Sequence, residues 1–293
     1  MDPNADSGWR ADPTDGAPWW AVDFGHDQRF GGIVIHWPEN LPSRAFHLQV
    51  SEEGETWTSI YQATKACGPV SHIATPGAET RHLRLVFDRA DCAALMRLTL
   101  KPDAFSSTPN EFIHSVAEDY PRGWHPRYWH REQSYWTPVG SPEGKRRALI
   151  NEEGLVEVDE AGFSLEPFIL TEGGLVTWAD AKVAVSLEKG GTPLPRVRWK
   201  AARLQLDILP WVDGAEDELV LRVTYRLRAT TASSNTRLVI AVRPFQVDPP
   251  WQAFRNLGGI SPIHDISVSD QGLSVEGRKV TATPQPEMKG GAL

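Results

Sequence analysis

Short apolar runs, several of them alternating with polar residues, recur along the whole chain and are separated by turn-forming residues. Because successive side chains of a strand point to opposite faces, such alternation predicts strands with one buried face. The longest example is ELVLRVTYRLRAT at 218–230, which is typical of an antiparallel sheet with one solvated face. The pattern therefore predicts an all-β protein.

The predicted strands fall into two groups, one on either side of a stretch that lacks the alternation. The first group comprises 19–24, 30–37, 45–51, 57–62, 70–74, 81–87 and 95–101. The second comprises 147–150, 154–159, 163–170, 174–178, 182–188, 196–200, 203–210, 218–229, 236–243, 264–269 and 272–276. We therefore predict a first domain at 1–102 and a second, larger antiparallel β-sandwich at 142–293 that ends in a polar tail.

The stretch between the two groups, residues 103–141, is predicted to be a connector with one short helix. Ser107 or Thr108 can cap that helix and Pro109 suits its first turn, so we place it at Glu111 to Glu118. The rest of the connector is dense in Trp, Tyr, His and Pro. Because aromatic side chains need burial, we expect this part to pack on the second domain.

Composition narrows the range of partners. The net charge of −8 disfavours nucleic acid, which needs a basic surface to neutralise phosphates. Twelve tryptophans supply core volume and also flat faces on which a sugar can stack. The two cysteines, Cys67 and Cys92, are too few for a disulfide framework or a four-cysteine zinc site. They either pair across the first domain or stay free, and we favour buried free thiols.

The first residues, MDPNADSG, have neither the basic start nor the apolar centre of a signal peptide. No apolar run is long enough to form a transmembrane segment. These observations leave the compartment open.

Four short motifs in the first domain carry a family resemblance: WWAVDFG at 19–25, QVS at 49–51, GETW at 54–57 and RHLRLVF at 81–87. Their order resembles the discoidin family, also called the coagulation factor 5/8 type C domain. The resemblance implies a jelly-roll β-sandwich that docks ligands, often sugars, on loops at one end. It also implies that Trp19, Trp20 and Trp57 belong to the core.

The same resemblance places candidate carbohydrate-binding residues on three loops, at 6–18, 37–44 and 88–93. A sugar site needs one apolar platform and a few convergent polar groups. Trp37 is the expected stacking platform for a pyranose ring. The residues expected to hydrogen-bond the sugar hydroxyls are His36, Glu39, Asn40, Arg44 and Arg89.

A calcium ion beside these loops is a further implication of the resemblance. Oxygen ligands suit calcium, and the N-terminal segment offers the carboxylates of Asp2, Asp6 and Asp12. Acidic loops are more often simply solvated, so the calcium site is the weaker of two open alternatives.

Motifs of the second half resemble a different group of proteins. PRGWHPRYWHREQSYWTPVG, LVTWADAKVAVSLEKGGTPLPRVRW and RPFQVDPPWQ are similar to the supersandwich that precedes an (α/α)6 toroid in six-hairpin glycosidase-like bacterial proteins. The resemblance implies a downstream helical catalytic domain as a partner and a location in the cytoplasm or outside the cell as part of a larger protein. Trp251, Gln252 and Arg255 follow a proline-stiffened corner and are candidates for docking to that domain.

The sequence thus favours a non-catalytic, carbohydrate-binding accessory region, with two alternatives. One is a protein- or lipid-interaction module, but the loop PENLPSR has only Leu41 as an apolar tip, and the acidic charge disfavours anionic membranes. The other is a stand-alone glycoside hydrolase, which needs two carboxylates across a cleft. Glu118, Glu132, Glu166 and Asp180 are carboxylates of this kind, but none lies in a recognisable catalytic motif.

Overall fold

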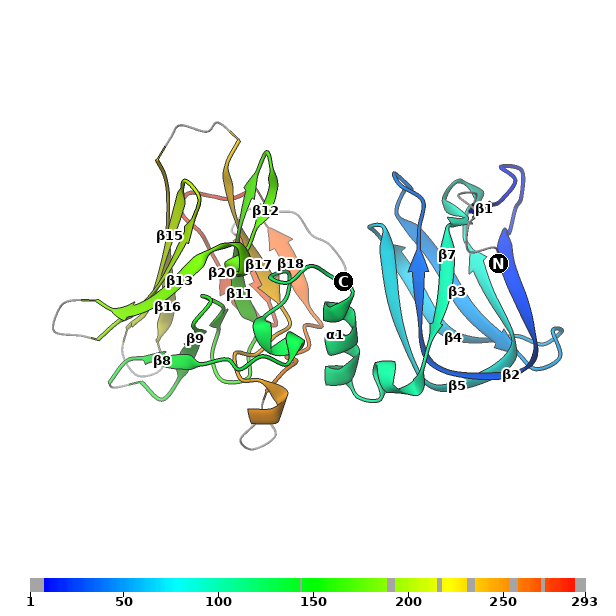
Figure 1. Ribbon diagram of the computed structural model, residues 1–293, viewed down its shortest axis with the longest axis horizontal. Coiled ribbons are helices and arrows are strands. Elements are labelled where there is room, and N and C mark those ends of the chain that lie inside the picture. The colour runs from blue at the N-terminus through cyan, green and yellow to red at the C-terminus, as the bar shows by residue number, and fades with distance from the viewer. Residues whose placement is uncertain are drawn as a thin grey trace. The chain divides into compact units, whose positions relative to one another are not determined.

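The computed structural model describes residues 8–142, 144–188, 193–214, 218–230, 235–252, 258–269 and 272–287. The chain forms two compact units, a first domain that extends to Val116 and a second domain at Ala117–Pro286. Both are built from antiparallel strands, which confirms the predicted all-β class (Figure 1).

The first domain holds seven strands among the described residues, at or near the predicted places. They are β1 (Trp9–Arg10), β2 (Trp19–His36), β3 (Arg44–Ser51), β4 (Thr58–Ala66), β5 (Val70–Phe87), β6 (Ala94–Leu95) and β7 (Arg97–Lys101). Five of them form one sheet in the order β4-β3-β5-β2-β7, and β1 pairs with β6. The sequence did not predict the two-residue strand β1.

The long strands β2 and β5 each take part in both layers of a sandwich. Residues 19–23 of β2 pair with 82–86 of β5, whereas 32–36 pair with 70–74. The register shifts between these two halves, and Gly25 lies there with a φ of 77°, a conformation that glycine adopts most easily. The predicted strands 19–24 and 30–37 are therefore the two halves of β2, and 70–74 and 81–87 lie in the two halves of β5.

The two layers close over one apolar core. The first halves and second halves of β2 and β5 send alternate side chains inward, as the period of two predicts. The core comprises Ala11, Phe30, Ile33, Ile35, Trp37, Phe46, Leu48, Ala63, Ile73, Leu83, Leu85, Phe87, Ala93 and Leu95.

The predicted connector helix is confirmed as α1 (Pro109–Glu118). The hydroxyl of Thr108 accepts a hydrogen bond of 3.1 Å from the backbone N–H of Glu111, so Thr108 rather than Ser107 is the cap. A short 3₁₀ helix, Asp103–Ser106, precedes it.

The second domain holds the remaining strands of the described chain. They are β8 (Trp136–Gly140), β9 (Arg147–Asn151), β10 (Val156–Glu157), β11 (Ser164–Thr171), β12 (Gly174–Val176), β13 (Lys182–Leu187), β14 (Pro195–Ala201), β15 (Leu204–Asp213), β16 (Val220–Ala229), β17 (Arg237–Arg243), β18 (Ile266–Ser269), β19 (Gly272–Val275) and β20 (Arg278–Val280). The sequence did not predict β8, which contains Pro138. Proline is tolerated there because β8 lies at the edge of its sheet.

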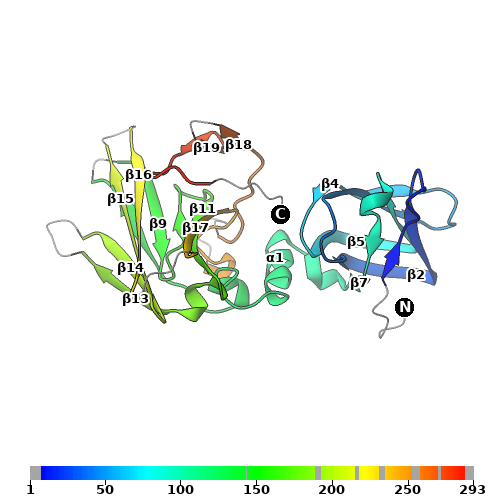
Figure 2. The ribbon, with the colours of Figure 1, turned by 90° about the horizontal axis from the view of Figure 1, so that it is seen from above.

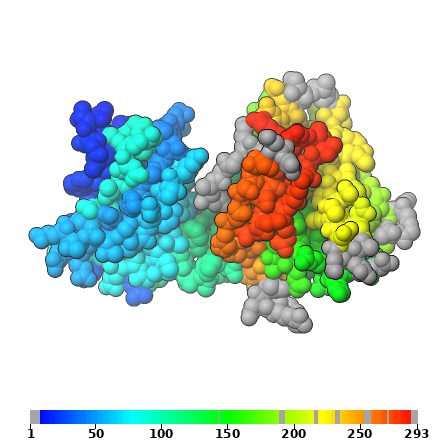
Figure 3. All heavy atoms as spheres, turned by 180° about the vertical axis from the view of Figure 1, so that it is seen from behind, coloured from blue at the N-terminus to red at the C-terminus, as the bar shows by residue number. Residues whose placement is uncertain are grey.

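Two sheets of the second domain face each other as a sandwich. One contains β8 to β12 with β17 added to β11, and the other is the meander β13-β14-β15-β16, visible side by side in Figure 2. Buried side chains from both sheets, including Ile150, Ile169, Trp199 and Ile208, form one core. The predicted larger antiparallel sandwich is thus confirmed. The small sheet β18-β19-β20 lies on the surface of this domain (Figure 3).

The aromatic part of the connector packs on the second domain, as predicted. Tyr128 and Trp129 are almost fully buried. The hydroxyl of Tyr128 donates a hydrogen bond of 2.7 Å to the carbonyl of Gln246, and the ring of Trp129 lies 5.7 Å from that of Phe245. Burial of large aromatic rings fixes this segment to the sandwich.

Both cysteines are free thiols, with Cys92 buried and Cys67 exposed. The expectation of free thiols is confirmed, although only one of them is buried. Across the described parts of the chain, no helix has the length and apolar character needed to cross a membrane.

Candidate functional site

A hollow of about 300 Å³ opens on the first domain between β1 and the start of β2. We call it the aromatic cleft; its lining is Trp9, Arg10, Ala11, Asp12, Asp15, Ala17, Pro18 and Trp19. The volume is within the range of sites that hold small molecules. The cleft falls on the loop 6–18, one of the three that the sequence pointed to.

Backbone hydrogen bonds hold both ends of this loop against the end of the sandwich. β1 pairs with β6, and the N–H of Ala11 donates to the carbonyl of Ala93 at 2.9 Å. At the other end the N–H of Phe87 donates to the carbonyl of Pro18, also at 2.9 Å. The cleft is therefore framed by paired backbone, which gives a ligand site a fixed shape.

The two tryptophans of the cleft differ in how they pack. Trp9 stacks on the buried Phe87 with ring centroids 6.0 Å apart, so its orientation is fixed by the core. Trp19 is 58% exposed, and the expectation that it belongs to the core is wrong. Because neighbouring residues of a strand point to opposite faces, the packing of Trp20 on the core turns Trp19 outward.

Charged groups stand beside these aromatic faces. Arg10, Asp12 and Asp15 are all exposed, so the cleft offers both hydrogen-bond donors and acceptors. The hydroxyl and backbone N–H of Thr14 donate to Asp12 at 2.6 and 2.9 Å and hold its pKa below the ordinary value. Asp12 is therefore ionised at neutral pH and fixed in place.

The predicted stacking platform, Trp37, is not available to a ligand. It is 4% exposed, its ring lies 5.4 Å from that of Phe46, and its indole N–H donates to Ser71 at 2.9 Å. Arg44 is buried as well, with its guanidinium 4.5 Å from the Trp37 ring. Burial lowers the pKa of Arg44. Both assignments, which rested on the loop 37–44, are corrected, because at the two ends of this loop these side chains point inward.

The other candidates for sugar contact lie at the surface. Glu39 and Asn40 are exposed in a turn where Asn40 has a φ of 59°, and Arg89 pairs with Asp91 at 3.3 Å. His36 is half-buried, with its Nε2 3.0 Å from the guanidinium of Arg97. None of these residues lines the aromatic cleft, and their roles remain predictions.

Two more side chains of the first domain bear on its partners. Leu41, the one apolar residue at the tip of the loop 37–44, packs against the core. It is therefore not available for insertion into a lipid bilayer, which the lipid-interaction alternative requires. Trp57 is half-buried rather than part of the core, with the guanidinium of Arg84 4.1 Å above its ring.

The described residues do not make up a calcium site. Of the three predicted carboxylates, Asp2 and Asp6 lie outside them, and Asp12 accepts from Thr14. No group of three or more metal-binding side chains occurs in the described ranges. Asp12 and Asp15 alone supply fewer oxygens than the six to eight that calcium takes.

Three of the four acidic side chains considered for hydrolysis make contacts within the second domain, and the fourth, Glu118, is the last residue of α1. Glu132 pairs with Arg122 at 2.7 Å, and Asp180 completes the capping box of a short 3₁₀ helix with Thr177. Glu166 is buried against Arg243 at 3.3 Å, where burial raises its pKa to about 7. Of the three, only Glu166 is enclosed by its own domain, whereas Glu132 is half-buried and Asp180 is exposed.

The proposed docking corner of the second domain is partly described. Trp251 and Gln252 belong to the short 3₁₀ helix Pro250–Gln252, and Trp251 is 51% exposed with its ring 6.4 Å from that of Tyr128. Arg255 lies outside the described residues. The docking role remains a prediction.

Comparison with known proteins supports the resemblance of the first domain. Residues 1–98 match the family model of the F5/8 type C domain, the segment in which the sequence resembles discoidin domains, so that resemblance is confirmed. No curated protein matches the chain.

Three solved structures illustrate the similarity. CpGH89CBM32-6 of Clostridium perfringens is 17% identical with a TM-score of 0.31, over 34% of this chain and 80% of that one. The C-terminal domain of a chitobiase from Bacteroides fragilis is 20% identical with a TM-score of 0.30, over 34% and 75%. Chitosan-binding module 2 of a Paenibacillus sp. IK-5 chitosanase/glucanase, solved with chitotriose, is 19% identical with a TM-score of 0.26, over 32% and 74%.

Proposed function

We propose that the first domain binds carbohydrate in the aromatic cleft. The observation that carries this proposal is that one hollow of about 300 Å³ is lined both by the aromatic residues Trp9 and Trp19 and by charged residues. The charged residues are Arg10, Asp12 and Asp15. Aromatic faces suit the apolar C–H faces of a pyranose, and the charged groups suit its hydroxyls. The F5/8 type C match of residues 1–98 supports the same conclusion.

Within the cleft, the two tryptophans have separate tasks. Trp9 is a preorganised wall because Phe87 fixes its ring, and it costs little side-chain entropy on binding. The exposed Trp19 closes over the ligand and loses solvent contact when it does so. Asp12, already ionised and fixed by Thr14, accepts hydrogen bonds from hydroxyl groups.

A glycan array that includes chitotriose tests this proposal. The intact chain should bind a defined class of sugar, and Trp19→Ala should weaken that binding at least tenfold, which corresponds to about 1.4 kcal/mol. The matched control is Tyr135→Ala in the second domain, which removes an aromatic side chain of similar exposure and should leave the signal unchanged. Binding that survives Trp19→Ala, or an array silent for the intact chain with and without calcium, contradicts the proposal.

We further propose that the chain is the accessory front of a larger glycosidase-like protein, in which the second domain docks a helical catalytic domain through Trp251, Gln252 and Arg255. The exposure of Trp251 next to Pro250 supports this, together with the motifs of the second half. An added helical domain should bury Trp251 and protect its fluorescence from iodide, by comparison with Trp251→Phe. Equal quenching with and without that domain contradicts the docking role.

A further inference from the structure

One face of the sheet β13-β14-β15-β16 is crowded with basic side chains. Strand register puts them on the same side, opposite the core residues Val197, Trp199, Leu206 and Ile208. We call it the arginine face; its basic residues are Lys182, Arg196, Arg198, Lys200, Arg222, Arg226 and Arg228. Within the strands only two carboxylates, Asp207 and Asp213, share this face, although the chain as a whole carries a net charge of −8.

Asp207 organises the centre of the arginine face. Its carboxylate accepts hydrogen bonds from Arg198 at 2.6 Å, Arg228 at 2.8 Å and Gln205 at 2.9 Å. Burial would raise the pKa of Asp207, but the hydrogen bonds from Gln205 and Arg198 outweigh it and lower the pKa. One fixed anion therefore holds two arginines in place without neutralising the face.

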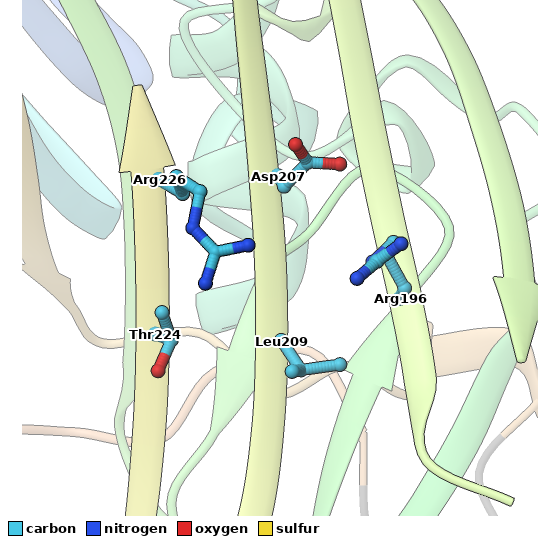
Figure 4. A pocket seen from close by; sticks show the side chains of 5 residues that line it. All are labelled: Arg196, Asp207, Leu209, Thr224 and Arg226. Atoms are coloured by element: carbon cyan, nitrogen blue, oxygen red, sulfur yellow. The ribbon is translucent and has the colours of Figure 1, made fainter. Parts of the chain in front are cut away.

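Two further arginines of the arginine face are paired, Arg196 with Glu188 and Arg222 with Asp213 at 3.1 Å, but other basic groups are not. Arg226 and Lys200 are exposed, and neither forms an ion pair with any residue that the structure describes. Figure 4 shows Arg226 and Arg196 on either side of Asp207, on three neighbouring strands. Lys182 and Lys200 lie directly opposite each other in the register. Cations placed in this way repel one another, so the arrangement favours a bound anion.

The arginine face has a shallow hollow at its centre. This hollow, lined by Arg196, Asp207, Leu209, Thr224 and Arg226, has a volume of about 10 Å³. That is room for a single water-sized group, such as one oxygen of an anion. The rest of the ligand has to lie along the surface, which favours an extended polymer.

The chemistry of the arginine face points to a polymer that carries hydroxyls as well as anions. Gln205 and Thr224 place acceptors for sugar hydroxyls between the cations, and the half-buried Trp211 stands opposite Arg222 on the next strand. The net charge of −8 disfavours a nucleic acid, which needs a broadly basic surface. We propose that the arginine face binds an acidic polysaccharide, one that bears carboxylate or sulfate groups, at a site separate from the aromatic cleft.

Affinity electrophoresis of the intact chain tests this inference, with polygalacturonate as the carboxylated probe, chondroitin sulfate as the sulfated one and dextran as the neutral one. Binding to at least one acidic probe, weakened by added salt, is expected, and dextran should not retard the chain. The double variant Arg226→Gln/Lys200→Gln should weaken binding about tenfold. The matched control Lys65→Gln/Lys279→Gln changes the net charge equally at exposed positions elsewhere and should bind as the intact chain does.

Several results would overturn the inference. One is the absence of binding to both acidic probes at low salt, and another is an equal loss in the two double variants, which would mark a non-specific effect of net charge. Tighter binding to single-stranded DNA or to anionic vesicles than to either polysaccharide would also overturn it. Because Trp19→Ala reports on the aromatic cleft, a chain that binds array glycans in a Trp19-dependent way but binds no acidic probe contradicts this inference alone.

Discussion

Trp19 and Trp37 lie at the two ends of one strand, and they differ in their exposure to solvent. Trp19 is the first residue of β2 and Trp37 is the residue after its last. The first is more than half exposed beside the aromatic cleft, and the second is enclosed by Phe46 and Phe87. Since both residues are of one type and flank the same strand, their chemical nature does not decide which of them is open to a ligand.

The difference in exposure follows from the alternation of side chains along β2 and from the bend in that strand. Trp20 packs inward, so Trp19 points outward; β2 then bends between its halves, and Trp37 points inward in the other layer. The comparison teaches that the tryptophan at this strand end is exposed because its neighbour, Trp20, already packs on the core.

The largest effect that we predict comes from Trp37→Ala. Removing this buried ring leaves a cavity among Phe46, Phe87 and Arg44 and should lower the free energy of unfolding of the first domain by about 3–5 kcal/mol. Urea unfolding followed by limited proteolysis of the first domain measures it. A loss below about 1 kcal/mol would contradict the enclosed position of Trp37.

A second, smaller effect contrasts the two domains through pH. In the second domain, burial raises the pKa of Glu157 to about 7 from 4.5, and Glu153 and Glu166 are shifted in the same direction. The folded state then holds protons that the unfolded state has released, so its stability is full below pH 4.5 and is lost as pH rises through 7. From Glu157 alone we expect a fall of about 2–3 kcal/mol between pH 5 and pH 8, since one pKa unit corresponds to about 1.4 kcal/mol.

The first domain should respond in the opposite direction. Arg81 hydrogen-bonds Asp23 at 2.9 Å and lowers its pKa, so the stability from this pair is present above the unfolded pKa of 3.8 and is lost on acidification. Urea midpoints of each domain at pH 3, 5 and 8 measure the contrast. Glu157→Gln should flatten the slope of the second domain alone, and an unchanged slope would show that Glu157 is ionised without cost.

The smallest effect on stability should come from Trp19→Ala. Because the side chain is mostly exposed, its loss should change the free energy of unfolding by less than about 1 kcal/mol. Thermal unfolding of the variant beside Trp37→Ala gives the comparison directly. A large destabilisation by Trp19→Ala would mean that the ring supports the cleft rather than a ligand.

Much of the fold was predictable from the sequence, because alternation of polar and apolar residues reports burial directly. The strands of the second domain from β9 to β19 lie close to the predicted segments. β8 was missed because Pro138 argues against a central strand, and alternation does not show that a strand is at an edge. β1 was missed because two residues carry no pattern, although they build one wall of the cleft.

The site was less predictable than the fold. A hollow lies on the loop 6–18, one of the three loops that the sequence indicated, but the side chains expected to bind were sought at Trp37 and Arg44, which are buried. The signal that could have found Trp19 is the WW pair, because one of two neighbouring tryptophans on a half-buried strand has to face outward. The arginine face had a signal too, in the alternating basic residues of ELVLRVTYRLRAT, but alternation does not show that neighbouring strands add to the same patch.

The most direct test of the central claim is an NMR titration of the tryptophan indole N–H signals, with the strongest ligand from the glycan array. Assignment by Trp→Phe variants separates the cleft from the core. Our account predicts that the Trp9 and Trp19 signals shift with the ligand while that of Trp37, whose indole donates to Ser71, stays in place. Shifts at Trp37 with Trp9 and Trp19 unchanged would contradict the assignment of the aromatic cleft as the binding site.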